Sequence, residues 1–511
     1  MLLQDCLSLA AKDLTCIIDG ERSFSSGEFD SLTSQFAADF ASNYKIQKRD
    51  RIAILLPNSW QFVAAFYASL KAGAIPVPID YRSSQREINF FLKESGASLL
   101  VADAAKHDFI KSSKDSPPQE ADLIQTLEVP SDPDADPYDF IGEHGATERI
   151  GKVETPIASH DPACILFTGG TTGISKGVVL SHDNVLAVQS RLSNAWALKR
   201  GSETFAQILP MTHSGGLNCG VNCAIFTGSR TVILRKFDPV KLLEAIEKYK
   251  VTVFAGVPTV YVSLLREDSI LTNRDISSLK ICFCSGSALS AETFMSFEKK
   301  TGIRINVGWG LTEAAPQLTV VPLNHTVAFD QLYVGVPLPD TRIVALGDDG
   351  ETLLGKDEVG ELAAKGPQVM KGYWKDREMA GAFTKDGWLR TGDVGFVATE
   401  GVYLLGRKKD VINSSGFKIW PHEVESTLLE NQHVMEAAVV GIRDEERGEV
   451  AVAFVVLKSE TTEGELRDFC KARLTTYKVP RKFIFREALP KSSVGKILRR
   501  ILREQEEGKN N

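Results

Sequence analysis

The sequence contains no uncharged apolar run long enough to cross a bilayer, and it has no excess of basic residues. A transmembrane helix needs about 20 predominantly apolar residues, so stable membrane insertion is not expected. The formal net charge is -7 over 511 residues, with acidic and basic side chains spread along the chain. Proteins that bind nucleic acid usually concentrate basic residues on one face, so nucleic acid is not an expected partner.

Paired cysteine motifs are also missing, because none of the eight cysteines belongs to a Cys-x-x-Cys pair. Most of them stand in apolar segments, which favours buried, reduced thiols over disulfides or a metal site. The first residues, Met1 to Cys16, lack the basic region of a signal peptide. Together these absences predict a cytoplasmic protein.

What the chain does contain is a repeated alternation of strand-like and helix-like segments. The strand-like segments 51–56 and 75–79 flank the helix-like segment 58–72, a pattern typical of parallel sheets with crossover helices. Between 338 and 396 short strands and turns predict a small antiparallel subdomain. The charged junction at 406–410 is the expected domain boundary, and no internal repeat is visible.

The clearest candidate for a ligand-binding segment is the loop 168–177, which separates two apolar runs. Its glycines allow the backbone to approach a ligand closely, its threonines add hydroxyl donors, and Lys176 adds a positive charge. These are the components of a polyphosphate site. The loop is not a Walker A motif, because Ser175 stands in place of that motif's second glycine and a strand-like segment follows. An ordinary flexible connection is the alternative.

Polar residues recur where other expected strands end. His213 follows the strand-like segment 204–209, and open α/β sheets bind ligands at such strand ends. A pocket role is therefore favoured over a role in starting a helix. Asp393 stands in a glycine-rich turn, where it either caps the turn or binds ribose hydroxyls through hydrogen bonds.

The segment 308–313 follows another expected strand. Trp309 stands between Gly308 and Gly310, and it is either a packing anchor or a ring whose face the glycines leave open for a purine. Thr312 and Glu313 offer a phosphate donor and an oxygen ligand for magnesium.

In their order along the chain, these segments resemble the adenylate-forming superfamily of acyl-CoA synthetases, luciferases and peptide-synthetase adenylation domains. The resemblance extends from about Thr15 to Arg500. The motifs are TGGTTGISKG (168–177), LPMTHSGG (209–216), SGSALS (285–290), GWGLTE (308–313), LRTGDVG (389–395), GRKKDVINSSGFKIWPHEVE (406–425) and LPKSSVGK (489–496).

The resemblance implies an α/β fold with two domains. The N-terminal domain, 1–408, would contain two parallel-type α/β subdomains and a small β-barrel-like subdomain, and would bind ATP and the carboxylic acid. The C-terminal domain, 409–511, would be small, mobile and α+β, and would swing about a hinge at Lys409.

The resemblance also implies nucleotide contacts. The β- and γ-phosphates would lie in a loop formed by Thr168, Gly169, Gly170, Thr171, Thr172, Gly173 and Lys176. Adenine would stack on Trp309 in a pocket formed with Gly286, Ser287, Ala288, Gly308 and Gly310. Asp393 and Arg407 would hold the ribose.

The catalytic assignments rest on the same resemblance. Thr312 would contact the α-phosphate, Glu313 would bind Mg2+, and Lys496 would contact both the substrate carboxylate and the α-phosphate. His213 belongs to the same catalytic pocket, and Gly416 would line the pantetheine tunnel after the small domain rotates. The motifs depart from the superfamily pattern at four positions, none of which removes a charged catalytic group: Gly169 for Ser, Ser175 for Pro, Ser415 for Gly and Trp309 for the commoner Tyr.

We therefore expect an AMP-forming acyl-CoA synthetase that uses ATP, Mg2+ and coenzyme A. The segment 217–222 lacks the acidic residue that amino-acid-activating relatives use, so a fatty or aryl acid is expected. An acyl carrier protein or a biosynthetic partner is the alternative acceptor, and an ATP-binding sensor without turnover is the non-enzyme alternative. A homo-oligomer is compatible with the sequence.

Overall fold

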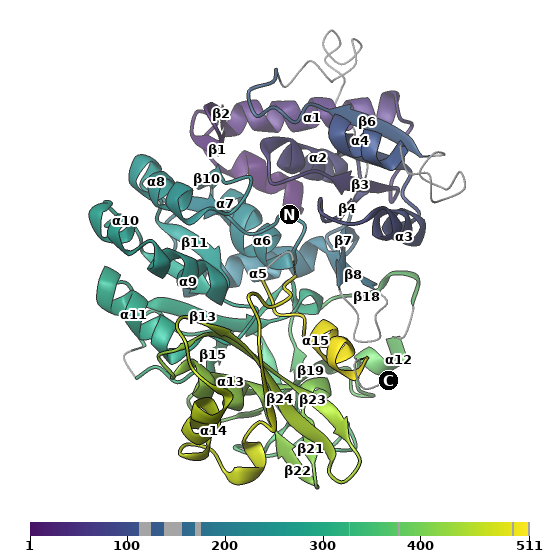
Figure 1. Ribbon diagram of the computed structural model, residues 1–511. Helices are drawn as coiled ribbons and strands as arrows, with labels where there is room; N and C mark the ends of the chain where they lie inside the picture. The colour runs from purple at the N-terminus through teal and green to yellow at the C-terminus, as the bar shows by residue number, and fades with distance from the viewer. Residues whose placement is uncertain are drawn as a thin grey trace.

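The computed structural model describes residues 1–111, 124–136, 156–168, 175–325, 328–376, 379–492 and 495–508. Figure 1 shows a large N-terminal part, drawn from purple to green, and a smaller C-terminal part drawn in yellow-green. No helix within the described ranges is long and apolar enough to cross a membrane. All eight cysteines fall within these ranges, and each is buried and free of disulfides, as the sequence predicts.

A fully parallel sheet lies close to the N-terminal end of the chain. Its order is β4 (Ile75–Pro78), β3 (Arg51–Leu55), β5 (Leu99–Asp103) and β6 (Gln125–Val129). Ile52 and Ile54 pack into the main core with helices α1 (Ser26–Ser42) and α2 (Trp60–Lys71). Ala53 and Leu55 pack on the opposite face with α3 (Gln85–Ser95). Both faces of β3 are covered, which explains why its residues after Arg51 are all apolar.

Apart from one antiparallel edge strand, the second and larger sheet begins with parallel strands. From its edge strand β2 (Arg22–Ser25) it contains β1 (Thr15–Asp19), β10 (Arg230–Ile233), β9 (Thr204–Gln207), β11 (Val253–Gly256), β12 (Ile281–Cys284) and β13 (Ile305–Gly310). Antiparallel strands then continue the same sheet: β14 (Gln317–Val320), β15 (Tyr333–Pro337), β20 (Val402–Arg407), β19 (Leu389–Val397), β17 (Gly360–Lys365) and β16 (Arg342–Leu346). The antiparallel subdomain expected from the sequence is thus hydrogen-bonded to the parallel strands through β13 and β14.

The antiparallel half curls around its own small core. One apolar cluster collects side chains from β13, β14, β15, β16, β17 and β20, including Leu318, Ile343 and Leu362. Strands that are several places apart in the sheet can share one cluster only if the sheet bends back on itself. This curvature gives the barrel-like shape, although β16 remains an open edge.

The helices of the N-terminal part cover the two sheets (Figure 1). Besides those already named, they are η1 (Leu3–Leu9), α4 (Ala104–Lys111), α5 (His182–Ala195), α6 (Ser214–Gly216), η3 (Leu217–Val221), α7 (Asn222–Phe226), α8 (Pro239–Tyr249), α9 (Pro258–Arg266), α10 (Asp268–Asn273), α11 (Ala291–Thr301), η4 (Thr312–Ala314), η5 (Trp374–Asp376) and α12 (Met379–Ala382). The small-residue helix expected after His213 contains one π-helical turn, η3. Such turns often occur at functional sites.

A separate antiparallel hairpin carries the loop 168–177. Its strands are β7 (Pro162–Thr168) and β8 (Lys176–Ser181), and β18 (Gly372–Tyr373) pairs with β8. The two strands confirm the predicted strand–loop–strand arrangement. Thr168 and Lys176 are Cα partners at the base of the loop. Gly169, Gly170, Thr171, Thr172 and Gly173 lie outside the described residues.

The C-terminal part has its own sheet and its own cores. The elements are η6 (Lys408–Asp410), β21 (Ile412–Ser414), β22 (Phe417–Ile419), α13 (Pro421–Leu429), β23 (Val434–Asp444), β24 (Gly448–Leu457), α14 (Glu463–Lys471), η7 (Thr476–Lys478), β25 (Lys482–Phe485) and α15 (Arg499–Glu507). Val439 and Ala453 pack on one face of the sheet, whereas Val440 and Phe454 pack on the other. This α+β arrangement agrees with the expected fold.

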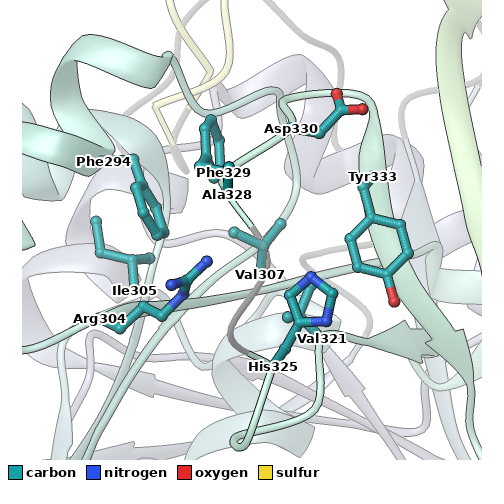
Figure 2. Close-up of a pocket in the computed structure, with 10 residues that line it drawn as sticks. All are labelled: Phe294, Arg304, Ile305, Val307, Val321, His325, Ala328, Phe329, Asp330 and Tyr333. Carbon is teal, nitrogen blue, oxygen red and sulfur yellow. The ribbon is translucent and has the colours of Figure 1, made fainter. Parts of the chain in front are cut away.

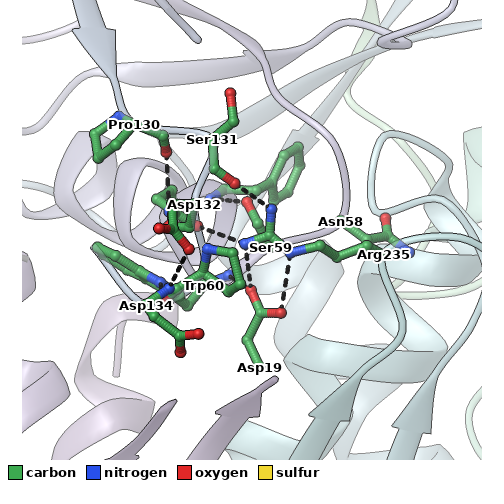
Figure 3. Close-up of polar contacts among 12 residues, drawn as sticks. Asp19, Asn58, Ser59, Trp60, Pro130, Ser131, Asp132, Asp134 and Arg235 are labelled. Atoms are coloured by element: carbon green, nitrogen blue, oxygen red, sulfur yellow. Dashed lines mark hydrogen bonds and ion pairs between the residues drawn. The ribbon is translucent and has the colours of Figure 1, made fainter. Parts of the chain in front are cut away.

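A buried ion pair connects β1 with the chain that follows β10 (Figure 3). Arg235 donates to Asp19 through Nε and Nη2, at 3.1 and 3.0 Å, and the Trp60 backbone N–H donates to the same carboxylate at 3.1 Å. Trp60 Nε1 donates to the carbonyl of Pro133 at 2.9 Å, and Arg235 also binds the carbonyl of Ser131. The pair therefore holds the segment 124–136 against the main core.

Replacement of Asp19 by alanine is expected to lower the free energy of unfolding by about 2–4 kcal/mol, because it leaves a partly buried guanidinium without its carboxylate. The Asp19 side chain is 2% exposed and that of Arg235 is 28% exposed. Glu21→Ala is the matched control, since its ion pair with Lys248 is largely exposed and should contribute less than about 1 kcal/mol. Equal melting temperatures for the two variants would contradict this assignment.

Candidate active site

Lys496 lies against the large domain because two glycines allow a close approach. A Cβ added to Gly286 would lie 3.1 Å from Lys496 Cε and 3.7 Å from Nζ. A Cβ added to Gly495 would lie 2.6 Å from the hydroxyl oxygen of Thr259. Both glycines also have positive φ angles, +92° and +79°, which other residues rarely adopt. In Figure 1 the yellow segment before α15 rises from the C-terminal part into the centre of the molecule.

Charged groups of the large domain surround the Lys496 ammonium. Burial and the nearby Arg407 guanidinium lower the pKa of Lys496, whereas Asp393 and Glu313 act in the opposite direction. The closed shape of the loop comes from Ser492, whose hydroxyl accepts the Lys496 backbone N–H at 3.2 Å. The site thus brings together a cation and two carboxylates that come from different elements, Asp393 from β19 and Glu313 from η4.

His213 caps the first turn of α6 at the edge of this site. Its Nδ1 accepts the backbone N–H of Gly215 at 3.1 Å, so the proton of the neutral ring lies on Nε2. Burial and, to a smaller extent, the Lys496 charge lower the pKa of His213 to about 4, although Asp80 acts in the opposite direction. His213 is therefore neutral at physiological pH and can donate a hydrogen bond through Nε2.

Asp393 is held by two donors from different strands. Arg407 is its Cα partner across β19 and β20, and Nε of Arg407 lies 2.7 Å from Oδ1. Trp309 Nε1 donates to Oδ2 at 2.7 Å. Burial raises the pKa of Asp393, and Arg407 and the indole N–H oppose that shift. The carboxylate is fixed in orientation and keeps acceptor capacity on both oxygens.

Glu313 lies beside the base of the loop 168–177. Tyr373 donates its hydroxyl to Glu313 Oε1 at 3.0 Å, and Lys176 Nζ lies 5.2 Å from the centre of the Tyr373 ring. The Met370 backbone N–H donates to the Glu313 carbonyl at 2.8 Å. Pairing of β18 with β8 brings these residues together. The glutamate is thereby positioned next to the expected phosphate loop.

The structure brings most of the predicted site residues to one region. Contacts or electrostatic interactions connect Lys496 with Gly286, Asp393, Arg407, Glu313 and His213. The other predicted residues adjoin them along the chain: Thr312 precedes Glu313, Ser287 and Ala288 follow Gly286, and Gly308 and Gly310 flank Trp309.

Two predicted residues lie apart from this region in the observed arrangement of the domains. Lys409 is exposed within η6, at the start of the C-terminal part. Gly416 lies in the exposed turn between β21 and β22, and no atom would come within 4 Å of a Cβ added there. Both belong to the part of the chain that would move in a domain rotation.

The sequence interpretation missed Tyr373 and Asp80. Tyr373 reaches Glu313 only because β18 pairs with β8, and no local pattern predicts that pairing. Asp80 follows β4 and acts on the pKa of His213. Its position just beyond the carboxyl end of a parallel strand is a signal that could have identified it.

A second pocket lies between α11, β13 and the chain around His325, and none of the predicted site residues lines it (Figure 2). Its walls are aromatic: Phe294 stacks on Phe329 with ring centres 4.2 Å apart, and His325 stacks on Tyr333 at 5.0 Å. Val307 of β13 also lines the pocket. The stacked rings pack against the strand that leads to Trp309.

The arrangement of charges suits a nucleoside polyphosphate with a divalent cation. Lys176, Arg407 and Lys496 supply positive charge, and Asp393 offers acceptors for hydroxyl groups. Among the described residues no three His, Cys, Asp or Glu side chains gather in one place. Mg2+ commonly binds through one or two carboxylates together with substrate phosphates, so Glu313 fits this role.

Activity should decline at alkaline pH as the Lys496 ammonium loses its proton. The pH of this decline should lie below the ordinary pKa of lysine. The pKa of Lys496 is lowered, and only the ammonium form carries the charge. Acid-dependent pyrophosphate release should therefore be full below this pKa and fall as the pH rises through it. Lys496→Arg, which stays charged above pH ~12, should lose this limit. A profile that is flat to about pH 10 would contradict the assignment.

Two family patterns match the chain. The AMP-binding enzyme pattern matches residues 8–374, and the AMP-binding enzyme C-terminal domain pattern matches residues 423–496. The long-chain-fatty-acid–CoA ligase of Bacillus subtilis (strain 168) is 37% identical over 491 residues, which cover 90% of this chain and 86% of that protein.

Solved structures with the same fold include ligand complexes. The crystal structure of ATP-bound MatB from Rhodopseudomonas palustris aligns over 100% of both chains, with a TM-score of 0.91 and 27% identity. The o-succinylbenzoate coenzyme A synthetase MenE from Bacillus subtilis, in complex with ATP and magnesium ion, covers 98% of both chains, with a TM-score of 0.83 and 28% identity.

Proposed function

The chain belongs to the AMP-binding enzyme family, and on that premise we propose that it converts long-chain fatty acids to their CoA thioesters. It is an ATP-dependent acid–thiol ligase that forms its product through an acyl-adenylate. The placement of Lys496 against Gly286, beside Asp393 and Glu313, is the observation that carries the proposal. That placement is the arrangement needed for the adenylation step.

In that step a carboxylate oxygen attacks the α-phosphorus of ATP. The new bond joins the carboxyl oxygen to phosphorus, the bond to the bridging oxygen breaks, and pyrophosphate leaves. Negative charge increases on the phosphoryl oxygens, and a preorganised cation is most effective where charge develops. We assign this role to Lys496, which would contact both reacting groups, and Thr312 would contact the α-phosphate.

The remaining groups would orient the nucleotide. Asp393 and Arg407 would bind the ribose, and the hairpin that contains Thr168 and Lys176 would hold the β- and γ-phosphates. Glu313 would hold Mg2+, which when bound supplies a positive charge to the phosphates. Neutral His213 would donate a hydrogen bond at the carboxylate end of the acyl pocket.

The second half-reaction needs a different arrangement of the domains. The CoA thiol attacks the acyl carbonyl carbon, AMP departs as the leaving group, and the thiol proton passes to solvent. We propose that domains 1–408 and 409–511 rotate about Lys409, which withdraws Lys496 and brings Gly416 to the pantetheine tunnel. The exposure of both Lys409 and Gly416 supports this proposal.

The chemistry of the helix after His213 supports a fatty acid over an amino acid. Its polar side chains are Asn218 and Asn222, which bond to each other at 2.8 Å. Tyr67 donates to Asn222 at 3.0 Å, and Ser214 accepts from Asn218 at 3.3 Å. These groups are neutral and satisfied, so the segment offers no anion for an α-ammonium group.

The buried cysteine thiols, none of which forms a disulfide, support a cytoplasmic location.

The proposal is tested by pyrophosphate release across a panel of fatty, aryl and dicarboxylic acids, with ATP and Mg2+, each with and without CoA. The thioester is followed by mass. A thioester with long-chain fatty acids is the expected result. Acyl-AMP without thioester would favour transfer to an acyl carrier protein instead. No pyrophosphate release with any acid would favour a protein that binds ATP without turnover.

A further inference from the structure

The side chain of Trp309 combines deep burial with one hydrogen bond. The residue is 5% exposed and packs in the curled antiparallel core with Leu318 and Val334. Its indole N–H donates to Asp393 Oδ2 at 2.7 Å. Strands β13 and β19 are separated in the sheet by β14, β15 and β20, so this hydrogen bond crosses the interior of the curl.

The glycines that flank Trp309 have a packing function. A Cβ added to Gly310 would lie 1.9 Å from the Pro316 carbonyl oxygen, and one added to Gly308 would lie 2.4 Å from Gln317 Nε2. The glycines therefore let β13 approach β14 closely. Thr319 accepts the Trp309 backbone N–H at 3.2 Å, which fixes the ring position further.

We propose that Trp309 is a positioning residue, whose indole N–H holds the carboxylate of Asp393 in the orientation that binds the ribose of ATP. The proposal rests on the proposed function, in which Asp393 contacts the ribose. Arg407 occupies one acceptor position on Oδ1 and Trp309 occupies one on Oδ2. A carboxylate oxygen can accept about two hydrogen bonds, so one position remains on each oxygen. Two such positions match a pair of adjacent ribose hydroxyls.

The indole N–H also stabilises the ionised form of Asp393. Burial raises the pKa of this carboxyl group, and the Trp309 hydrogen bond opposes the shift. Loss of the N–H should therefore move the acidic limit of kcat/KM for ATP to higher pH. The other charged groups that shift the pKa of Asp393 are Arg407, Lys496 and Asp410. A Trp309 substitution leaves all three in place.

The test measures acid-dependent pyrophosphate release by wild type and Trp309→Phe, which keeps an aromatic ring and removes the N–H. KM for ATP should rise roughly tenfold, with little change in kcat. In the wild type, replacing ATP by 2′-deoxy-ATP or 3′-deoxy-ATP should lower kcat/KM for the nucleotide, and we call this factor the penalty. The penalty should be smaller in the variant, because the Trp309 substitution and the missing ribose hydroxyl remove the same interaction. The penalty for replacing ATP by ITP, which changes only the base, should stay the same.

Trp196→Phe is the matched control. Trp196 is also buried, and its Nε1 donates to Asn306 at 3.2 Å on the same strand, β13. This variant should lose comparable thermal stability without any change in ribose discrimination. If Trp309→Phe does not fold, Trp309→Met takes its place, since Met fills apolar space and carries no strong hydrogen-bond donor.

Two results would overturn the inference. One is unchanged discrimination between ATP and the deoxynucleotides in the Trp309 variant. The other is a penalty for ITP that shrinks as much as the penalty for the deoxynucleotides, which would show that the variant loses nucleotide contacts in general and not the ribose contact in particular. If the wild-type protein released no pyrophosphate with any acid, the proposed function would be refuted. The failure of the inference and the failure of the proposed function are therefore distinguishable.

Discussion

Replacement of Lys496 by alanine is expected to slow acyl-adenylate formation by about a thousandfold, because the site loses the cation that faces the developing charge. Thioester formation from added acyl-adenylate should fall by less than about fivefold, since that step transfers no phosphoryl group. The two half-reactions are measured separately, as ATP-dependent acyl-AMP formation and as conversion of added acyl-AMP with CoA.

Lys491→Ala is the control for this result. Lys491 lies in the same loop, but its Nζ pairs with Glu436 within the C-terminal domain, at 2.7 Å. Its removal should leave both half-reactions nearly unchanged. Equal losses in the two half-reactions of Lys496→Ala would contradict the assignment of this lysine to adenylation.

Replacement of Glu313 by glutamine is expected to lower the adenylation rate by about a hundredfold and to raise the Mg2+ concentration needed for half-maximal activity. Glutamine preserves the shape of the side chain and an acceptor for Tyr373, but it removes the negative charge. The measurement is a Mg2+ titration of acyl-AMP formation at saturating ATP.

Tyr373→Phe separates the charge of Glu313 from its orientation. This variant keeps the carboxylate and loses only the hydroxyl that donates to Oε1 at 3.0 Å. A change of less than about tenfold is expected, the usual scale for one hydrogen bond. An unaltered Mg2+ requirement in Glu313→Gln would refute the proposed metal contact.

The parallel core could be predicted from the sequence because its strands are buried on both faces. Segments such as β3 and β12 are continuous apolar runs between helix-like segments, and the structure confirms both as parallel strands. The hairpin around the loop 168–177 was also predictable, since two apolar runs border it closely. These features depend on local pattern alone.

The contacts within the site could not be predicted from the same patterns. Lys496 reaches Gly286 only through the docking of two separately packed cores, and sequence spacing does not determine that docking. The close approach of β13 to β14 that Gly308 and Gly310 allow could not be predicted either, because the pairing of these two strands is not visible in a local pattern. Residue identities indicated the chemistry, whereas strand pairing and domain orientation determine which groups meet.

The central claim is that a carboxylate attacks the α-phosphorus of ATP in this site. The most direct measurement uses a long-chain fatty acid labelled with oxygen-18 in its carboxyl group, with ATP, Mg2+ and CoA, and analyses the products by mass. The account predicts acyl-CoA together with AMP that carries one labelled oxygen, and unlabelled pyrophosphate. Release of ADP, or label in phosphate or pyrophosphate, would show attack at a different phosphorus and contradict the account.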